Sequence, residues 1–195
     1  MKSAERVFRA GLPQGSVLSP TFFLLWAATL VRELRAIPGA SPYMYADDTA
    51  VLCAGNTTEV ATSQGQSPDW AAVDAVYCWS QRSMMTLSAE KTQMLVLSQW
   101  HRDAVDCSIK VAGKTVAASD TISLLGVKLD RLLHFGPHCR SLRGRVRPRV
   151  EHLRRLFGRS WGLDEGVFRT VADGYVRGAL EHAATAWRLR LRRPT

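Results

Sequence analysis

The sequence predicts an α+β fold, in which an antiparallel sheet backed by helices is followed by a helical, basic region. A hydrophobic content of 46% in 195 residues is enough to form a core. The first two thirds hold β-prone runs separated by turns that contain Gly or Asp. From Pro137 onward apolar residues instead recur at steps of three and four among arginines, which is typical of helices.

The first backing helix is expected near residues 20 to 36. Ser19 and Pro20 are typical of an N-cap and a first helical position. The residues from Phe22 to Leu34 are apolar almost all round, so we expect this helix to be buried. The apolar stretch is broken by polar residues and is too short to cross a membrane. A second backing helix is expected at residues 68 to 85, with one face made of Val73, Val76, Tyr77 and Ser80.

Several β-prone runs are expected to form the sheet. Two of them flank Asp47 and Asp48, so the acidic pair should lie at the tip of a hairpin. A second hairpin should turn at Ala112 and Gly113, where glycine favours a tight reversal. The predicted strands and hairpins are Tyr43–Ala46, Thr49–Cys53, Met94–Leu97, Ser108–Val116 and Ser123–Leu129.

Charge divides the chain at residue 130. Residues 1–130 hold 11 Lys/Arg against 12 Asp/Glu, whereas residues 131–195 hold 15 against 5, a net charge of +10. Such a basic segment is expected to bind a polyanion. Nucleic acid is a common one, because cationic side chains that contact its phosphates release condensed counterions, which favours binding. An anionic membrane surface is the competing interpretation.

The cysteines and histidines give little sign of a disulfide framework or a metal finger. Four cysteines are scattered without paired spacing and no signal peptide is recognisable, which favours an intracellular protein with reduced thiols. Zinc ligation has the right atoms but the wrong spacing. The residues considered for zinc are His134, His138 and Cys139, with His101 or Cys107. Four tryptophans are candidates for base stacking or core packing, namely Trp70, Trp100, Trp161 and Trp187.

Asp47 and Asp48 concentrate negative charge on a tight turn. Their hard oxygen atoms suit Mg²⁺ or Mn²⁺, and Mg²⁺ takes one or two protein carboxylates while water and substrate phosphates complete its shell. The pair is thus a candidate for phosphoryl transfer. The dipeptide by itself favours a turn whose aspartates only cap backbone N–H groups, because such turns are common.

The surrounding motifs resemble those of reverse transcriptases. Gly11-Leu12-Pro13-Gln14-Gly15-Ser16-Val17-Leu18-Ser19-Pro20 followed by Tyr45-Ala46-Asp47-Asp48 resembles two successive polymerase motifs. Trp79, Leu87-Ser88-Ala89-Glu90-Lys91-Thr92 and Leu125-Gly126-Val127-Lys128-Leu129-Asp130 follow in the order seen in enzymes of non-LTR retrotransposons. Group II intron and retron-type enzymes share the first two motifs, whereas the later ones look more like the retrotransposon class.

The resemblance implies a partial polymerase palm at residues 1–130 and a basic helical thumb or connection region at 131–195. It implies RNA-directed DNA polymerase activity, with an RNA template, a DNA primer, a dNTP and Mg²⁺ or Mn²⁺, in an intracellular and nuclear protein. Asp47 is then a ligand of two catalytic metals and Asp48 its neighbouring carboxylate. Lys91 is implied to assist the departing pyrophosphate.

The resemblance also assigns contacts to substrates. Tyr45 is implied near the primer terminus, and Pro13, Gln14 and Gly15 near the incoming nucleotide and the template base. Leu125, Gly126 and Val127 are implied to grip the primer from a strand. Arginines of the basic region are implied to contact the nucleic-acid backbone, namely Arg140, Arg143, Arg145 and Arg147. Each of these sets has an ordinary structural alternative, such as a turn, a buried strand or a solvated helix face.

Enzymes of this family carry a further catalytic aspartate and a fingers region upstream of the Gly-Leu-Pro-Gln-Gly loop, and only ten residues precede Gly11. We therefore expect the metal site to be incomplete, the chain alone to be inactive and poorly soluble, and the N-terminal part of the polymerase to be a partner. The alternative is a noncatalytic nucleic-acid-binding remnant that keeps the basic region.

Overall fold

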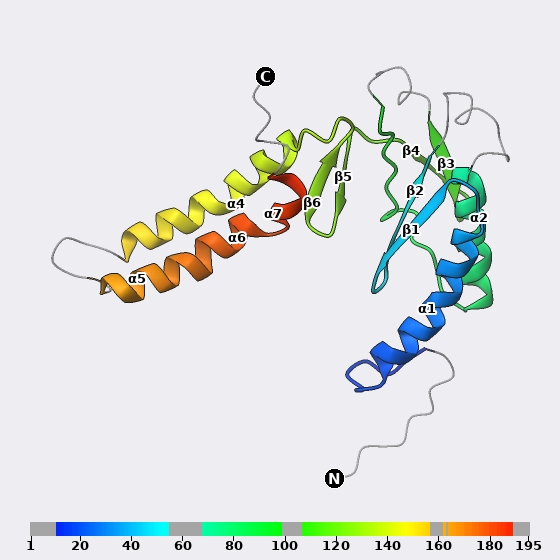
Figure 1. Cartoon of the computed structure of the whole chain (residues 1–195), viewed down its shortest axis with the longest axis horizontal. Coiled ribbons are helices and arrows are strands. Elements are labelled where there is room, and N and C mark those ends of the chain that lie inside the picture. The colour runs from blue at the N-terminus through cyan, green and yellow to red at the C-terminus, as the bar shows by residue number, and fades with distance from the viewer. Residues whose placement is uncertain (1–10, 55–67, 99–106, 157–161, 163, 189–195) are drawn as a thin grey trace, which may run out of the picture. The chain divides into compact units, whose positions relative to one another are not determined.

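The computed structural model describes residues 11–54, 68–98, 107–156, 162 and 164–188. The chain forms two compact units (Figure 1). The first unit is Met1–Met94 with Asp106–Ala118, and the second is Leu95–Val105 with Ser119–Thr195. Helices and antiparallel strand pairs make up both units, so the α+β class is confirmed. The division at residue 130 was drawn on charge, and it stays a prediction.

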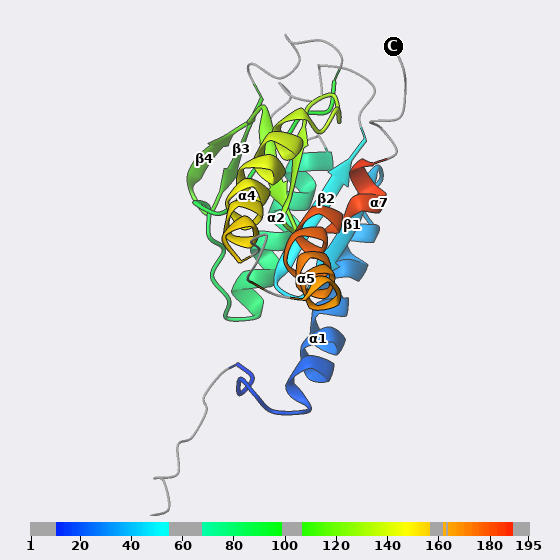
Figure 2. The same cartoon turned by 90° about the vertical axis from the view of Figure 1, so that its left-hand side faces the viewer.

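The core of the first unit lies between two helices and a hairpin. Helices α1 (Ser19–Arg35) and α2 (Pro68–Arg82) pack on each other and on the antiparallel pair β1 (Ala40–Tyr45) and β2 (Asp48–Cys53), as Figures 1 and 2 show. The buried residues at the centre are Leu30, Leu34, Ala72 and Trp79. The predicted arrangement of backing helices and an acidic hairpin is therefore confirmed for this unit.

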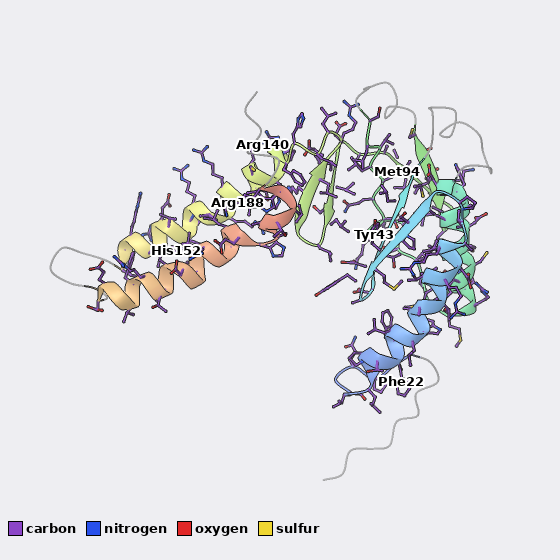
Figure 3. All side chains as sticks on the ribbon, viewed as in Figure 1. Phe22, Tyr43, Met94, Arg140, His152 and Arg188 are labelled. Carbon is purple, nitrogen blue, oxygen red and sulfur yellow. The ribbon has the colours of Figure 1, made fainter. Side chains whose placement is uncertain are left out.

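Helix α1 differs from the prediction in its start and in its burial. Ser19 is the first helical residue rather than the N-cap, and its Oγ donates to the carbonyl oxygen of Pro13 at 2.7 Å. The expectation of burial all round is wrong. Phe22, labelled in Figure 3, is 52% exposed and Leu25 is 66% exposed. Within the described chain α2 and the hairpin cover one side of the helix only, so only residues on that side are buried.

Helix α2 ends at Arg82, before the predicted limit at residue 85, and Met84 adopts a left-handed φ of 53°. Its buried face is also rotated relative to the prediction. Ala72 and Trp79 are buried together with Ser80, whereas Tyr77 is exposed. Trp79 takes the central place because its ring stacks against Trp26 with the centroids 4.4 Å apart.

The hairpin at Ala112 and Gly113 is confirmed, with β3 (Ser108–Val111) and β4 (Lys114–Ala117) as its strands. The predicted strand Met94–Leu97 is wrong. Met94 forms a single parallel bridge with Ala118. Met94 and Ala118 are the last residues of the two segments that make up the first unit, so this bridge lies at the boundary of the unit.

The second unit begins with a hairpin where one continuous strand was predicted. The predicted strand at residues 123–129 is replaced by two strands, β5 (Thr121–Leu124) and β6 (Val127–Asp130), which pair antiparallel. The two residues between them, Leu125 and Gly126, have φ of 47° and 80°. Two successive left-handed residues reverse the chain with the twist that a two-residue hairpin needs. The prediction failed because leucine rarely adopts this conformation.

Most of the described residues from Gly136 onward are helical, as predicted for the arginine-rich region. The longest helix is α4 (Gly136–Arg155), which contains Pro148, and it packs beside the later helices (Figures 1 and 2). Leu142 and Leu153 of the predicted apolar series are buried, whereas Leu156 is exposed. No helix in the described ranges is long and apolar enough to span a membrane. The later helical elements are α5 (Glu165–Ala172), the π-helix η2 (Asp173–Arg177), α6 (Gly178–Glu181) and α7 (Ala184–Trp187).

Candidate functional site

The acidic pair lies at the tip of the β1–β2 hairpin. Tyr45 pairs with Asp48 across the strands, which leaves Ala46 and Asp47 as the two turn residues. Ala46 has a left-handed φ of 51°, an uncommon conformation for a residue with a side chain. Both aspartates and Tyr45 are exposed. The hairpin therefore presents two carboxylates and an aromatic ring to solvent at one point of the first unit.

The donor set at this tip fits a hard divalent cation. Two carboxylates on adjacent residues match the one or two protein ligands that Mg²⁺ typically takes. Among the described residues, no group of three or more His, Cys, Asp or Glu side chains lies close enough to hold a metal ion. The hairpin by itself thus offers two carboxylates, and substrate phosphates and water are the remaining ligands that Mg²⁺ accepts.

The loop that precedes α1 is a turn whose glycine is required by its backbone. The N–H of Ser16 donates to the carbonyl oxygen of Pro13 at 3.4 Å, and Gly15 between them has φ of 89°. A Cβ on Gly15 would meet no described atom within 4 Å, so conformation rather than crowding selects glycine here. Pro13, Gln14 and Gly15 are all exposed. Among the described residues, no hydrogen bond or ion pair joins this loop to the acidic hairpin.

Lys91 and Trp79, the two later motif residues of the first unit, differ in their surroundings. Lys91 is exposed in a turn in which its N–H donates to the carbonyl oxygen of Ser88 at 3.2 Å. Trp79 is 7% exposed, and its Nε1–H donates to Thr29 Oγ1 at 2.8 Å. Trp79 is therefore a core residue, whereas Lys91 is accessible to a ligand.

The residues assigned to primer contact form the turn of the β5–β6 hairpin. Leu125 and Gly126 are exposed at the turn, and Val127 is buried at the start of β6. The expectation that they form a continuous strand is wrong, although the three residues remain together. A turn presents its backbone to a ligand more openly than a paired strand does.

Three residues that the sequence did not single out for this role position the hairpin. The carboxylate of Asp130 accepts from the N–H groups of His134 and Phe135 at 3.0 and 2.6 Å, just before α4 begins. The Nδ1 atom of His138 accepts from the N–H of Lys128 at 3.2 Å. His182 Nε2 lies 3.1 Å from the carbonyl oxygen of Leu125. Asp130 was detectable as an acid just before a predicted helix, but the histidine contacts were not.

The predicted backbone-binding arginines divide between two sides of α4. Arg140, Arg143 and Arg147 follow one another at steps of three and four, so they share a side of the helix. Arg145 lies elsewhere, on the side that carries buried His138 one heptad earlier. Figure 3 shows Arg140 near the start of α4 and His152 toward its end. The structure therefore brings together three of the four arginines.

A groove of about 570 Å³ runs along this side of α4. Its floor is apolar, and three arginines with Glu151 rim it. Arg147 Nε lies 3.2 Å from Glu151, while Arg149 instead donates to the carbonyl oxygen of Tyr175 at 2.7 Å and is structural. The groove is lined by Cys139, Leu142, Arg143, Val146, Arg147, Val150, Glu151, Arg154, Leu180 and Trp187.

The histidines and cysteines considered for zinc do not form a metal site among the described residues, and the tryptophans do not form a shared site there. His134 and Cys139 are not part of any metal-binding group among the described residues, nor are His138 and Cys107, and His101 lies outside the described residues. Trp187 packs edge-on against His138 with the centroids 5.5 Å apart. Trp70 is half-buried, and Trp100 and Trp161 lie outside the described residues.

No disulfide bond joins cysteines within the described chain. Burial raises the pKa of Cys53 to about 12, with Asp69 adding a negative charge and a hydrogen bond. The thiol therefore stays protonated near neutral pH and is a poor nucleophile.

Residues 1–129 match the model of the reverse transcriptase (RNA-dependent DNA polymerase) family, and the chain therefore belongs to this family. It is 28% identical over 190 residues to the retrovirus-related Pol polyprotein from type-1 retrotransposable element R1 2 of Nasonia vitripennis, which covers 91% of this chain and 43% of the relative. It is 30% identical over 162 residues to the probable RNA-directed DNA polymerase from transposon BS of Drosophila melanogaster, covering 80% and 17%. No solved structure matches the chain.

These relatives confirm the resemblance to reverse transcriptases of non-LTR retrotransposons. A further relative is the RNA-directed DNA polymerase from mobile element jockey of Drosophila melanogaster, 28% identical over 78% of this chain and 16% of the relative. The chain thus spans less than half the length of these three proteins.

Proposed function

We propose that the chain supplies the metal-binding hairpin and the primer- and template-contacting surfaces of an RNA-directed DNA polymerase that copies RNA from a DNA primer. The observation that carries this proposal is the tight β1–β2 turn, which presents Asp47 and Asp48 together in a chain of the reverse transcriptase family. Residues 1–130 are then part of the palm, and the basic helical region at residues 131–195 is the thumb or connection region.

Mg²⁺ or Mn²⁺ would be held by Asp47, with Asp48 as its neighbouring carboxylate. When bound, two such ions stabilise the attacking and leaving oxygens of nucleotidyl transfer. Tyr45 stands across the strands from Asp48, where it can contact the primer terminus. Pro13, Gln14 and Gly15 present an exposed turn to the dNTP and the template base. Lys91 is exposed and so accessible to the departing pyrophosphate.

The N-terminal part of the polymerase is the proposed protein partner, and the β1–β2 sheet has an edge that suits it. The N–H of Ala54 donates to the carbonyl oxygen of Gly39 at 2.9 Å, one position before Ala40 and Cys53 pair. In an antiparallel strand pair, residue pairs that exchange hydrogen bonds alternate with pairs that do not, and Pro42 belongs to a pair that does not. Its backbone nitrogen therefore faces the outer edge of β1, where proline has no N–H to donate to a further strand. A further strand therefore adds more readily to β2.

The exposed apolar side of α1 supports the same partner. Phe22, Leu24 and Leu25 are 52%, 63% and 66% exposed in a protein whose relatives are much longer. Phe22 and Leu25 are three positions apart and so share one side of the helix, and exposed apolar neighbours of this kind often mark an interface. We propose that the segment which adds a strand to β2 also covers this side of α1. The nuclear location and the absence of a membrane partner remain part of the proposal.

Primer extension on an RNA template with Mg²⁺ and dNTPs tests the proposal. The protein is the chain joined to a preceding polymerase segment, and Asp47→Asn should abolish extension because it removes a ligand charge while keeping the shape. Lys91→Ala should slow extension less, since that residue only assists the leaving group. Lys110→Ala, an exposed change on β3, is the matched control. Full activity of Asp47→Asn would overturn the metal assignment, and extension by the chain alone would show the expected incompleteness wrong.

A second candidate function is binding of nucleic acid without catalysis. The arginine-rimmed groove on α4 favours it, because phosphate binding needs no metal site. Binding by the chain with no extension by the joined protein would favour this second function.

A further inference from the structure

The β5–β6 hairpin is fastened at two points by histidines that come from outside it. His138, the third residue of α4, accepts the N–H of Lys128 in β6 at 3.2 Å. His182, between α6 and α7, approaches the carbonyl oxygen of Leu125 in the turn at 3.1 Å. Because a carbonyl oxygen only accepts, His182 Nε2 carries the proton and donates. One histidine therefore holds a strand and the other holds the turn.

The first of these bonds requires a neutral histidine. Nδ1 of His138 accepts a hydrogen, so the ring proton must be on Nε2, and that atom has no hydrogen-bond partner among the described residues. The side chain is 0% exposed. Burial lowers the pKa of His138 below its ordinary value of 6.5, and Arg145 of α4, His182 and Lys128 of β6 lower it further. Every charged or titratable group known to face the ring thus opposes its protonation.

The hairpin depends on such anchors. A two-stranded hairpin is marginal alone, and its turn holds Leu125 in an unfavourable left-handed conformation. A Cβ on Gly126 would lie 3.1 Å from His182 Nε2, so the turn backbone and this imidazole are in close contact. Trp187 completes the arrangement, because its ring packs on His138 and its Nε1–H donates to the carbonyl oxygen of His182 at 3.0 Å.

We propose that His138 and His182 are positioning residues, which fix the turn at Leu125 and Gly126 relative to α4 so that turn and arginine groove engage a primed nucleic acid as one element. The proposal rests on the proposed function, since that function assigns the turn to the primer and the groove to the phosphates. Trp187 couples the two parts directly, because it also lines the groove.

The arrangement makes the position of the turn depend on pH. A histidine exposed to solvent has an ordinary pKa of about 6.5, whereas burial lowers the pKa of His138. As the pH falls below about 6.5, protonation therefore increasingly favours states in which the His138 ring is exposed and its bond to Lys128 is broken. A protonated Nδ1 cannot accept from Lys128, so the hairpin loses its anchor on α4. General phosphate binding changes in the opposite direction, because histidines that gain charge attract a polyanion more strongly.

Two measurements on the full chain test the proposal. The first is hydrogen exchange at the Lys128 amide, which His138→Ala should accelerate about fivefold, the effect of one net hydrogen bond. His138→Asn keeps an acceptor without a titrating ring, so it should restore slow exchange, and the protection of the Lys128 amide relative to its intrinsic exchange rate should no longer change with pH. His134→Ala, an exposed histidine four residues earlier, is the matched control.

The second measurement compares affinity for an RNA–DNA hybrid with a recessed primer end against a blunt hybrid of equal length. His138→Ala and His182→Ala should reduce the preference for the primed end about fivefold and leave the salt slope unchanged, because no phosphate contact is removed. Unchanged Lys128 exchange in His138→Ala, or an unchanged primed-end preference in both variants, would overturn the proposal. If the wild-type chain bound neither hybrid, the proposed function itself would fail and the positioning role with it.

Discussion

The division of arginines on α4 predicts which side chains carry the salt dependence of nucleic-acid binding. Replacing Arg143 and Arg147 by alanine removes two cations from the groove while leaving its apolar floor in place. Each lost phosphate contact lowers the slope of log affinity against log salt by about 0.7 to 0.9, so the pair should lower it by about 1.4 to 1.8. Glu151 forms an ion pair with Arg147 at 3.2 Å and partly neutralises its charge, so we expect a decrease in slope near the lower end of this range.

The assay is fluorescence anisotropy with a labelled RNA–DNA hybrid between 50 and 200 mM salt, about a fourfold range over which binding of this kind changes strongly. Arg177→Ala is the matched control, because Glu181 hydrogen-bonds to that arginine and, with the more distant Asp173, neutralises its charge and raises its pKa. Adding Arg145→Ala to the pair decides whether the fourth predicted arginine also contacts phosphate. An unchanged slope in the double variant would refute the reasoning and assign these arginines to a solvated helix face.

Three further predictions concern stability, and each is measured by denaturant or thermal unfolding. Gly126→Ala should destabilise the chain by more than Gly113→Ala, because both glycines are left-handed but only Gly126 has a neighbour, His182, within 4 Å of an added Cβ; equal losses would show that the contact does not matter. Asp130→Ala should cost about 1.5 to 3 kcal/mol through loss of the hydrogen bonds that its carboxylate accepts from the N–H groups of His134 and Phe135, and a neutral result would show that these bonds do not stabilise the chain. The wild type should lose stability as pH falls below about 6.5, since burial lowers the pKa of His138, and His138→Asn should lessen that loss; identical pH profiles would refute this assignment.

Local patterns predicted the elements whose causes are local. The acidic hairpin was predictable because two β-prone runs flank a short polar turn, and the observed pairing of Tyr45 with Asp48 places that turn as expected. The same holds for the hairpin at Ala112 and Gly113 and for the helical, arginine-rich region. Family motifs indicated metal binding by Asp47 and Asp48, whereas the residue types alone left metal binding and capping open.

What the sequence did not predict depends on contacts between distant residues. Leu125 and Gly126 looked like part of one strand because a leucine seldom takes a left-handed φ, and the His182 contact at this turn joins residues 57 positions apart. Helix α1 was predicted to be buried all round because its residues are hydrophobic. The sequence does not show how many other elements pack against the helix. The division of the arginines between two sides of α4 follows from their spacing along the helix once the buried side is known. Buried His138 identifies that side.

Two of the left-handed turns in the described chain, one from each unit, show how a strained turn can be used differently. At the first, Ala46 has φ of 51°, and no described residue forms a hydrogen bond or ion pair with the carboxylates of Asp47 and Asp48 beside it. At the second, Leu125 has φ of 47°, and the His182 imidazole holds its carbonyl oxygen. A turn whose polar groups are satisfied within the chain is fixed before a ligand arrives, whereas exposed carboxylates become fixed when a cation binds them. Asp47→Asn should therefore leave unfolding within about 0.5 kcal/mol of wild type while removing metal-dependent extension, because an exposed turn residue contributes little to stability. A large loss of stability in that variant would show that Asp47 holds the fold rather than the metal.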